Sequence, residues 1–321
     1  MTTTYAASLA DIREAAEILR GHAHRTPVQT CSALNERAGR ELYFKCEHLQ
    51  KIGAFKFRGA FHAIRRLSEA ERARGVVTHS SGNHAQALAL AAKLHGIPAH
   101  VIMPSNASAP KKAGVIEYGA NVIECEPTLE ARETTAARVQ EETGAAFIPP
   151  FDHPHIIAGQ GTAALELLED VPDLDAVIAP VGGGGLLSGT CLAAHGIRSD
   201  LRVFAAEPLG ADDAARSMAA GEMIPQTSPN TVADGLLTSL GELTWPIIRD
   251  HCEAVITVGE EEIVKAMRVS WERGKLLIEP SAAVTVAAVL SDQFRSLSGL
   301  RKVGVILSGG NLDLDRIPWA V

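Results

Sequence analysis

The sequence has few cysteines, and their arrangement suits neither a metal site nor a disulfide framework. The five, Cys31, Cys46, Cys125, Cys191 and Cys252, are odd in number, widely spaced and without a Cys-x-x-Cys pair. This pattern argues against a zinc site and a disulfide-stabilised scaffold. Reduced thiols are typical of a cytoplasmic protein, and no basic flank followed by an apolar run indicates a signal peptide.

Long apolar runs and basic patches are also missing. Each long apolar stretch is of strand length or is interrupted by glycine or polar residues, so no membrane span is predicted. The net charge is −8, with both signs scattered along the chain, which argues against a nucleic-acid partner. With 321 residues, 46% of them hydrophobic, the chain can form a large core in two domains or one large domain.

The sequence does contain a regular alternation of short β-branched runs with Ala- and Leu-rich stretches. The expected strands are 42–46, 75–79, 99–103, 121–125, 176–181, 202–207, 254–258 and 302–308. The expected helices are 60–67, 83–95, 109–118, 128–142, 159–168, 185–195, 260–273 and 281–291. Strand–helix alternation of this kind predicts an α/β fold with open parallel sheets.

The strand–helix pairs fall into two groups, which predicts two domains. Residues 75–147 would form a smaller domain, inserted in a larger one made of residues 1–70 and 150–321. Ligands of such folds bind beyond the carboxyl ends of the strands. A cleft between the two domains is therefore the expected ligand site.

Two segments near strand ends carry reactive or anion-binding groups. Lys56 stands among aromatic residues, where desolvation would lower its pKa and make the amine nucleophilic enough to form a Schiff base. Taken alone, a lysine near a helix start is usually a solvated surface charge. Residues 80–86 place hydroxyls, a glycine and free N–H groups at a helix start, which suits a carboxylate or phosphate. Simple N-capping by Ser81 or Asn83 explains that segment equally well.

Two further segments follow later strands. Four glycines between a strand and a helix would let the backbone approach a phosphate closely, where the helix start supplies N–H donors; they are Gly182, Gly183, Gly184 and Gly185. A flexible turn is the alternative. Ser308 ends the last strand, where its hydroxyl could meet a ring nitrogen or a substrate, although an ordinary turn explains this segment when it is taken alone.

The glycine run also invites comparison with nicotinamide-dinucleotide sites, because Glu207 ends the next strand, where a ribose-binding acid would stand. The Gly-x-Gly-x-x-Gly fingerprint fails, however. Counted from Gly183 and Gly185, its third position is Ser188, and Gly189 comes one residue late. No phosphate-binding Gly-Lys-Ser/Thr follows either. A nicotinamide-dependent dehydrogenase stays a distant alternative.

In their order and spacing, the four segments together resemble the fold-type II pyridoxal-phosphate (PLP) family, and most closely its serine racemase and serine/threonine dehydratase branch. The resemblance extends from Thr26 to Trp319 and includes further stretches: Lys45-Cys46-Glu47, residues 157–161, Ala206-Glu207-Pro208 and Glu279-Pro280-Ser281. It implies a tryptophan-synthase-β-like fold, PLP as cofactor and a homodimer. The cysteine-forming branch fits less well, because it carries threonine at the position of His84.

The resemblance also implies an activity. The protein would be an ammonia-lyase that dehydrates a small β-hydroxy amino acid, such as L-serine or L-threonine, to a 2-oxo acid and ammonia, and it would also racemise serine. Lys56 would hold the cofactor and later act as the base at Cα. Phe55 would pack against the ring, Asn83 would bind the 3′-oxygen, residues 182–185 the phosphate, and Ser308 the ring nitrogen. A serine there does not force that nitrogen to be protonated, so the electron sink is weaker.

The substrate side of the site is implied in the same way. The carboxylate would sit at the helix start formed by Ser80, Ser81, Gly82, Asn83 and His84. Ser81 would face the side of Cα opposite Lys56 and return a proton there, which would allow racemisation. Arg132 matches an arginine near the active site and could bind a distal carboxylate, so that 3-hydroxyaspartate is an alternative substrate. A surface arginine with i,i+4 partners is the other explanation.

Glu207, the Ala211 carbonyl and Asp213 resemble the family's divalent cation site. Oxygen ligands favour Mg²⁺ or Ca²⁺ over zinc, and a solvated acidic turn is the alternative. Residues 152–155 depart from the family pattern, and their two histidines are expected to lie in a loop, since two alone rarely hold a metal. A relative that binds a ligand without catalysis is disfavoured because Lys56 is present.

Overall fold

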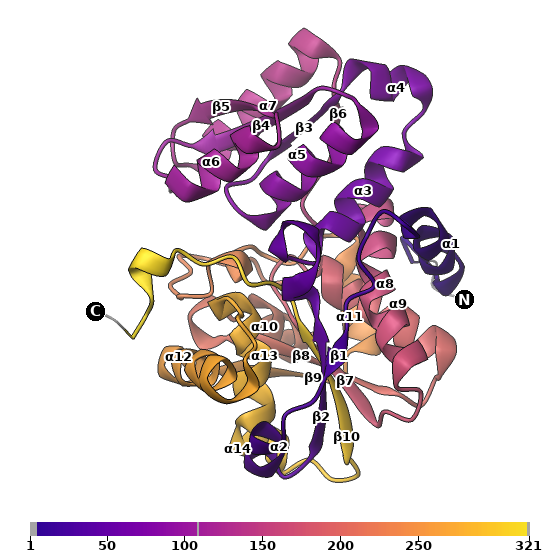
Figure 1. The fold of residues 1–321 in the computed structure, drawn as a ribbon, viewed down its shortest axis with the longest axis vertical. Coiled ribbons are helices and arrows are strands. Elements are labelled where there is room, and N and C mark those ends of the chain that lie inside the picture. Colours follow the sequence, from indigo (N-terminus) through magenta and orange to yellow (C-terminus); the bar gives the residue numbers. More distant parts are fainter. Residues whose placement is uncertain (1–4, 108, 320–321) are drawn as a thin grey trace.

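The computed structural model describes residues 5–107 and 109–319, which form two sheets stacked one above the other (Figure 1). The lower, six-stranded sheet has the order β1-β2-β10-β7-β8-β9. The upper, four-stranded sheet has the order β5-β4-β3-β6. The strands are β1 Val28–Gln29, β2 Glu41–Cys46, β3 Val76–His79, β4 Ala99–Pro104, β5 Asn121–Cys125, β6 Ala146–Phe147, β7 Ala176–Pro180, β8 Arg202–Pro208, β9 Ala254–Val258 and β10 Lys302–Leu307.

Each of the expected strands is present, with ends that differ by at most one residue. The α/β fold predicted from the sequence is confirmed. The sheets are parallel except at one edge, where the two-residue strand β1 pairs antiparallel with β2. The remaining pairs are parallel. Two-residue strands such as β1 and β6 carry no periodicity, which is why the sequence did not indicate them.

The helices cover both faces of each sheet. Their bounds are α1 Leu9–Leu19, α2 Ser32–Ala38, α3 Lys56–Arg66, α4 Glu69–Arg74, α5 Asn83–His95, α6 Ala109–Glu117, α7 Leu129–Thr143, α8 Pro154–Asp170, α9 Gly185–Ile197, α10 Asp213–Ala220, α11 Thr244–His251, α12 Glu260–Val269, α13 Pro280–Leu290 and α14 Asp292–Arg295. Two predicted starts are wrong: α3 begins at Lys56 and α8 at Pro154, a residue suited to a first helical turn. The expected helix 260–273 ends its α-helical part at Val269 and continues as a π-helical turn, Ser270–Gly274.

Alternate residues along the buried strands face opposite helical layers. In the upper sheet, Val76 and Val101 pack with α5, whereas Val77 and Ile102 pack with Val139 of α7. Successive side chains of a strand point to opposite faces, so a strand that is buried on both must be apolar throughout. This is why apolar residues are adjacent in β3 (Val76-Val77) and in β4 (Val101-Ile102-Met103) instead of alternating with polar ones.

The lower sheet is built in the same way. Phe44, Ile178 and Val305 face the layer that contains α13. Val177 and Ile306 face the opposite layer, which contains α8 and α9. Both faces are therefore dry, and polar chemistry is confined to the strand ends.

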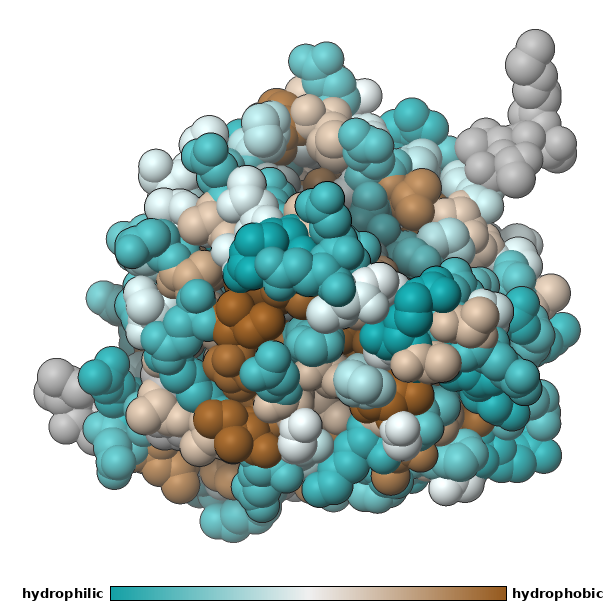
Figure 2. All heavy atoms as spheres, turned by 90° about the horizontal axis from the view of Figure 1, so that it is seen from above, coloured by the Kyte–Doolittle hydropathy of each residue, from teal (hydrophilic) through white to brown (hydrophobic). Residues whose placement is uncertain are grey.

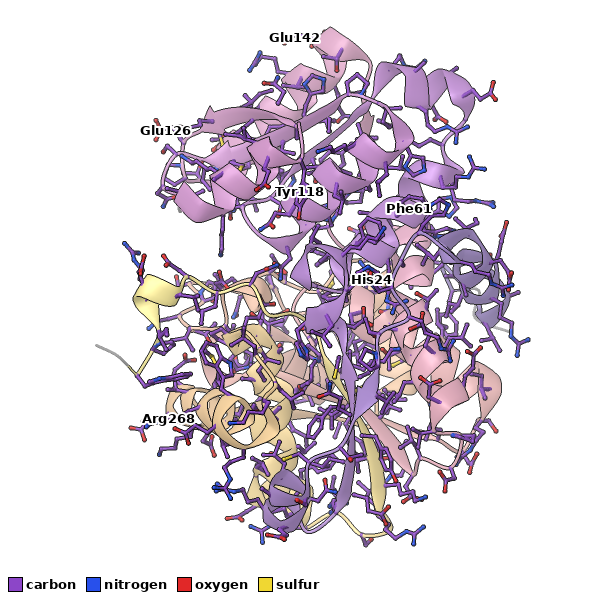
Figure 3. All side chains as sticks on the ribbon, in the orientation of Figure 1. His24, Phe61, Tyr118, Glu126, Glu142 and Arg268 are labelled. Atoms are coloured by element: carbon purple, nitrogen blue, oxygen red, sulfur yellow. The ribbon has the colours of Figure 1, made fainter. Side chains whose placement is uncertain are left out.

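Helix α3 and the first turn of α8 form a middle layer where the upper and lower halves meet (Figure 1), and the rest of α8 runs along the lower sheet. One hydrophobic cluster joins Phe57, Phe61 and Ile156 of this middle layer to Val76 and Leu88 of the upper sheet and its helix, and Figure 3 labels Phe61 at this junction. The lysine helix is thus packed against both halves of the molecule.

The outer surface is ordinary for a globular protein. Seen from above, over the four-stranded sheet, it is mostly hydrophilic and carries separate apolar patches (Figure 2). In residues 5–107 and 109–319, no helix is both long and apolar enough to cross a membrane.

Candidate active site

The segments singled out in the sequence meet where strands of both sheets end. The Phe55 N–H donates to the Ser308 carbonyl at 3.0 Å, and Ala54 forms a β-bridge with Gly309. Asn311 donates its side-chain Nδ2 to Asn83 Oδ1 at 2.8 Å. The lysine segment, the residue 80–86 segment and the end of β10 therefore lie in direct hydrogen-bonding contact.

Lys56 is the first residue of α3, and its amine points toward the middle of this junction. Its Nζ donates to the Pro150 carbonyl at 2.7 Å and lies 5.2 Å from the centre of the Phe55 ring. Burial lowers the pKa of Lys56 to about 8, although the charge of Glu279 acts in the opposite direction. A lysine with such a pKa supplies a substantial fraction of free amine near neutral pH, as Schiff-base chemistry requires.

The Asn83 side chain is held by a buried carboxyl group that sequence reasoning did not identify. Asn83 Nδ2 donates to Glu279 Oε1 at 2.9 Å, and the Asn311 N–H donates to Glu279 Oε2 at 3.1 Å. Burial, helped by the charge of Asp234, raises the pKa of Glu279 to about 8. Glu279 stood in one of the matching stretches, but no local signal shows that it is buried.

The loop before Lys56 contains a strained residue. Ile52 has φ +59°, a region that β-branched residues rarely adopt. Its carbonyl accepts from Asn311 Nδ2 at 2.6 Å. Backbone strain of this kind persists where surrounding contacts enforce it, often at functional sites.

The four glycines form a cradle with no space for side chains. Gly184 has φ +88°, and a Cβ on Gly183 would lie 2.3 Å from ring carbons of Phe151. Thr244 Oγ1 donates to the Gly183 carbonyl at 2.9 Å and so orients the loop. Helix α9 begins at Gly185 without a side-chain cap, so its first N–H groups stay available for an anion. The cradle therefore fits a phosphate.

The start of α5 offers a second set of free N–H groups. Its N-cap is Gly82, which makes no side-chain capping bond, so the alternative of capping by Ser81 or Asn83 is wrong. Ser81 is partly exposed, whereas Ser308 on the other side of the junction is 3% exposed.

His84, in the first turn of α5, is buried and neutral. Its Nε2 lies 3.0 Å from the Ile148 carbonyl, which can only accept, so this nitrogen carries the proton. Burial, followed by the charge of Lys56, lowers the pKa of His84 to about 3. The ring therefore adds no positive charge to the site, and anion binding there depends on the helix N–H groups.

Residues 19–309 match the family described as "Pyridoxal-phosphate dependent enzyme". The chain belongs to this family. It is 53% identical over 312 residues to a serine racemase of Dictyostelium discoideum, covering 97% of this chain and 96% of that protein. It is 49% identical to a beta-hydroxyaspartate dehydratase of Paracoccus denitrificans, covering 98% and 99%. Maize serine racemase superposes with a TM-score of 0.96 at 50% identity, covering 97% and 95%.

Membership of the PLP family explains why the site contains a buried lysine, which would have no role in a nicotinamide-dependent dehydrogenase. Lys56 offers an amine for the cofactor's aldehyde and the glycine cradle fits its phosphate, whereas the dinucleotide fingerprint is incomplete. The nicotinamide alternative therefore has no support.

Arg132 lies half-buried on α7, near the end of β3. Its Nε donates to the Thr128 carbonyl at 3.3 Å. This contact joins residues four positions apart, as expected for a surface helix arginine, although Arg132 forms no ion pair among residues 5–107 and 109–319. The pKa of His79, the last residue of β3, is lowered first by burial and next by the positive charge of Arg132. Ser80 and Ser81 follow directly.

Two buried carboxyl groups stand at the predicted cation site. Glu207 accepts from the Ala214 and Ala215 N–H groups, both at 2.9 Å, and Asp213 Oδ2 accepts from the Leu240 N–H at 3.0 Å. Asp213 Oδ1 is buried without a hydrogen-bond partner in the part of the chain that the structure describes.

Both carboxyl groups are shielded from water, which affects how they ionise. Burial raises the pKa of Glu207 to about 8 and that of Asp213 to about 6. The alternative of a solvated acidic turn is wrong, since both residues are fully buried. The described residues contain no cluster of three His, Cys, Asp or Glu side chains suited to a metal. Two carboxylates with the buried Ala211 carbonyl would instead form an all-oxygen set that fits a hard cation.

The expectation that both histidines of residues 152–155 lie in a loop is wrong for His155, which belongs to the first turn of α8. His153 caps α8, and its Nδ1 accepts from the His155 N–H at 3.2 Å. Asp152 Oδ1 accepts from the Leu243 and Thr244 N–H groups at 2.9 and 3.2 Å. This segment therefore connects the site to the start of α11.

Proposed function

We propose that the protein is a PLP-dependent ammonia-lyase that dehydrates a small β-hydroxy amino acid, such as L-serine or L-threonine, to a 2-oxo acid and ammonia, and that it also racemises serine. The observation that carries the proposal is the buried Lys56 amine, with its lowered pKa, together with the hydrogen-bonded Asn83 and Asn311 amides and a glycine cradle. The similarity to serine racemases and to a dehydratase supports both activities.

In this proposal the bound cofactor supplies an electron sink for negative charge at the substrate Cα. Lys56 would hold the cofactor, and its amine, which the Pro150 carbonyl keeps in place, would take the α-proton. The second N–H of the Asn83 amide, directed by Glu279 and Asn311, would be available to the cofactor's 3′-oxygen. Phe55 would pack against the ring, and Ser308 would meet the ring nitrogen.

The substrate carboxylate binds at the uncapped start of α5, where N–H groups and the positive end of the helix dipole favour an anion. The site residues there are Ser80, Ser81, Gly82, Asn83 and His84. Ser81 holds a proton on the face of Cα opposite Lys56, and returning it on that face inverts the configuration.

We also propose the wider setting of the enzyme. Residues 1–70 and 150–321 form the large domain and residues 75–147 the small one. Mg²⁺ or Ca²⁺ binds Glu207, the Ala211 carbonyl and Asp213 and supports the site without taking part in the chemistry; a chelator should lower activity reversibly. The protein works as a cytoplasmic homodimer without a nucleic-acid or membrane partner.

The test is proton NMR of the purified protein with PLP, Mg²⁺ and L-serine in D₂O. Pyruvate is expected, together with α-deuterated serine of both hands. Lys56→Ala should show neither product. Wild-type turnover in Lys56→Ala would overturn the proposal, and the absence of both products from the wild type would remove serine as a substrate.

A second substrate, 3-hydroxyaspartate, is favoured by Arg132. The half-buried guanidinium without an ionic partner stands near the residues that would bind substrate and could hold a distal carboxylate in bidentate fashion. Arg132→Met should raise KM for 3-hydroxyaspartate at least tenfold and leave L-serine kinetics unchanged. Arg138→Met, on the exposed face of the same helix, is the control. Equal effects on both substrates would contradict this role.

A further inference from the structure

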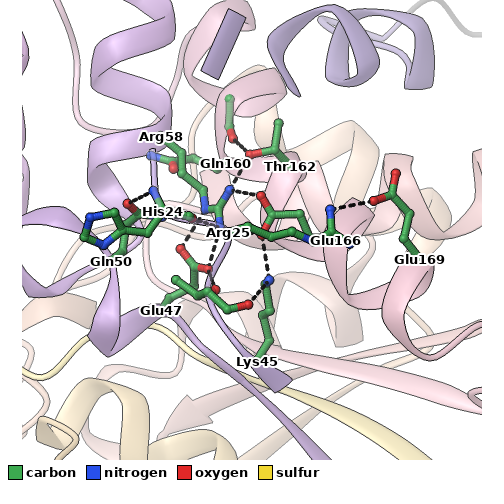
Figure 4. Close-up of polar contacts among 12 residues, drawn as sticks. His24, Arg25, Lys45, Glu47, Gln50, Arg58, Gln160, Thr162, Glu166 and Glu169 are labelled. Atoms are coloured by element: carbon green, nitrogen blue, oxygen red, sulfur yellow. Dashed lines mark hydrogen bonds and ion pairs between the residues drawn. The ribbon is translucent and has the colours of Figure 1, made fainter. Parts of the chain in front are cut away.

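A buried network of four charges lies directly behind the lysine helix (Figure 4). Arg58 donates through Nε and Nη2 to both oxygens of Glu47, at 2.7 and 2.8 Å. It donates through Nη1 and Nη2 to both oxygens of Glu166, at 2.7 and 2.8 Å. Lys45 Nζ donates to Glu166 Oε2 at 2.6 Å. Two cations and two anions therefore neutralise one another inside the protein.

The network is dry. The side chains of Arg58, Lys45 and Glu47 are fully buried, and that of Glu166 is 15% exposed. Although burial alone would raise it, the charge and hydrogen bonds of Arg58 hold the pKa of Glu47 below its ordinary value. Arg58 in turn has a raised pKa, since the two carboxylates outweigh its burial. Glu47 and Arg58 therefore stay ionised over the working pH range.

Such a network adds little to the free energy of unfolding. Desolvating buried ions costs several kcal/mol each, and well-packed hydrophobic residues of the same size are often as stable or more so. The first turn of α3 also carries two cations, Lys56 and Arg58, at the positive end of the helix dipole, without a side-chain cap. The carboxylates of Glu47 and Glu166 offset that unfavourable placement.

The network instead determines where one turn of helix lies. Arg58 closes that turn, because its N–H donates to the Phe55 carbonyl at 3.0 Å. The same turn is fixed on its other side by the bond between Phe55 and Ser308. Glu47 directly follows β2 and Glu166 belongs to α8, so the planar guanidinium ties the turn to two separate elements. Lys56 lies between these anchors and projects to the opposite side, toward Pro150.

We propose that Arg58, with Glu47 and Glu166, is a positioning residue for Lys56: the bidentate pairs hold the first turn of α3 so that the amine meets the cofactor and the substrate Cα. This inference rests on the proposed function of Lys56. A guanidinium that binds two carboxylates in bidentate fashion fixes direction as well as distance, which a lysine at this position cannot do.

The experiment compares three holoenzyme variants. Arg58→Lys keeps the charge but loses the bidentate geometry. A quadruple variant, K45M/E47M/R58M/E166M, removes all four charges and leaves the net charge unchanged. Arg25→Met breaks ion pairs with Glu169 and Asp170 on the exposed side of α8 and is the control. The measurements are thermal unfolding, kcat and KM for L-serine, and the pH midpoint of the bound cofactor's absorbance.

Both network variants are expected to bind the cofactor. Their kcat should be about 100-fold lower, because a misplacement of roughly 1 Å has an effect of this size. Their KM should change less than threefold. The absorbance midpoint should shift in both, and the quadruple variant should melt close to the wild type. Arg25→Met should match the wild type throughout.

Wild-type kcat and absorbance midpoint in either network variant would overturn the inference. If the quadruple variant does not fold, Arg58→Lys decides alone, since its charge is retained. Lys56→Ala is measured beside these variants, because retained turnover in Lys56→Ala would mean that the proposed function itself has failed. Loss of turnover in Lys56→Ala with normal turnover in Arg58→Lys would refute only the positioning role.

Discussion

Helices α3 and α8 approach each other closely at two glycines, Gly59 and Gly159, and this contact offers a test of how Lys56 is positioned. A Cβ added to Gly159 of α8 would lie 2.7 Å from Gly59 Cα and 2.9 Å from the Arg58 carbonyl oxygen. Both are backbone atoms of α3 and cannot rotate away. Ordinary contacts between such atoms are about 3.5–4.0 Å, so Gly159→Ala must move α3 on the order of 1 Å.

Two opposing effects determine the stability of Gly159→Ala. Overpacking costs about 1–3 kcal/mol, and replacing a helical glycine by alanine returns up to about 1 kcal/mol. The net loss of unfolding free energy is therefore small. Activity should respond more strongly, because a shift of about 1 Å of the helix that carries Lys56 costs about 100-fold in rate.

The assay is kcat for L-serine together with thermal unfolding of the holoenzyme. Gly114→Ala is the matched control, since this helical glycine of α6 faces only the flexible Gln86 side chain, whose nearest atom is 3.3 Å from the added Cβ. It should be as active and at least as stable as the wild type. Wild-type kcat in Gly159→Ala would show that the spacing of α3 and α8 does not position the lysine.

Three further outcomes are expected. Ser81→Ala should lose serine racemisation but keep dehydration of L-serine, measured by chiral chromatography and pyruvate release; equal loss of both would contradict a two-base mechanism. In Glu279→Gln, the new amide N–H faces one of the two donors that Glu279 accepts from, Asn83 Nδ2 or the Asn311 N–H, and this costs about 1–3 kcal/mol. PLP should therefore bind about 5- to 150-fold more weakly in an absorbance titration; unchanged affinity would rule out a role of Glu279 in orienting Asn83. Glu207 and Asp213 have pKa values raised to about 8 and about 6, so the metal-free folded chain keeps protons that the unfolded chain releases, and its stability should fall as pH rises from about 4 to 8. Cation binding needs both carboxylates ionised, so calorimetric affinity for Mg²⁺ or Ca²⁺ should rise from pH 6 to 8, and a flat profile would argue against this site.

Much of the architecture is visible in the sequence because its causes are local. A strand buried on both faces is a continuous apolar run, and the glycine run after β7 marks the turn into α9 by itself. Lys56 and the segment 80–86 could be singled out for the same reason, since each follows a recognisable strand. The start of α8 at Pro154 was missed because Asp152, His153 and Pro154 directly before Ile156 are residues typical of a turn.

The sequence alone therefore determined the α/β class and the strands other than β1 and β6, and it singled out the segments that we propose to carry the chemistry. Only the tertiary structure decided how their side chains are held. The Asn83–Glu279 hydrogen bond joins residues 196 positions apart, and Arg58 meets Glu166 across 108 positions. No local pattern distinguishes a glutamate that will be buried beside an amide or a guanidinium from one that will be solvated. Burial and pairing set the charge and orientation of these groups, and both arise only when distant segments pack together.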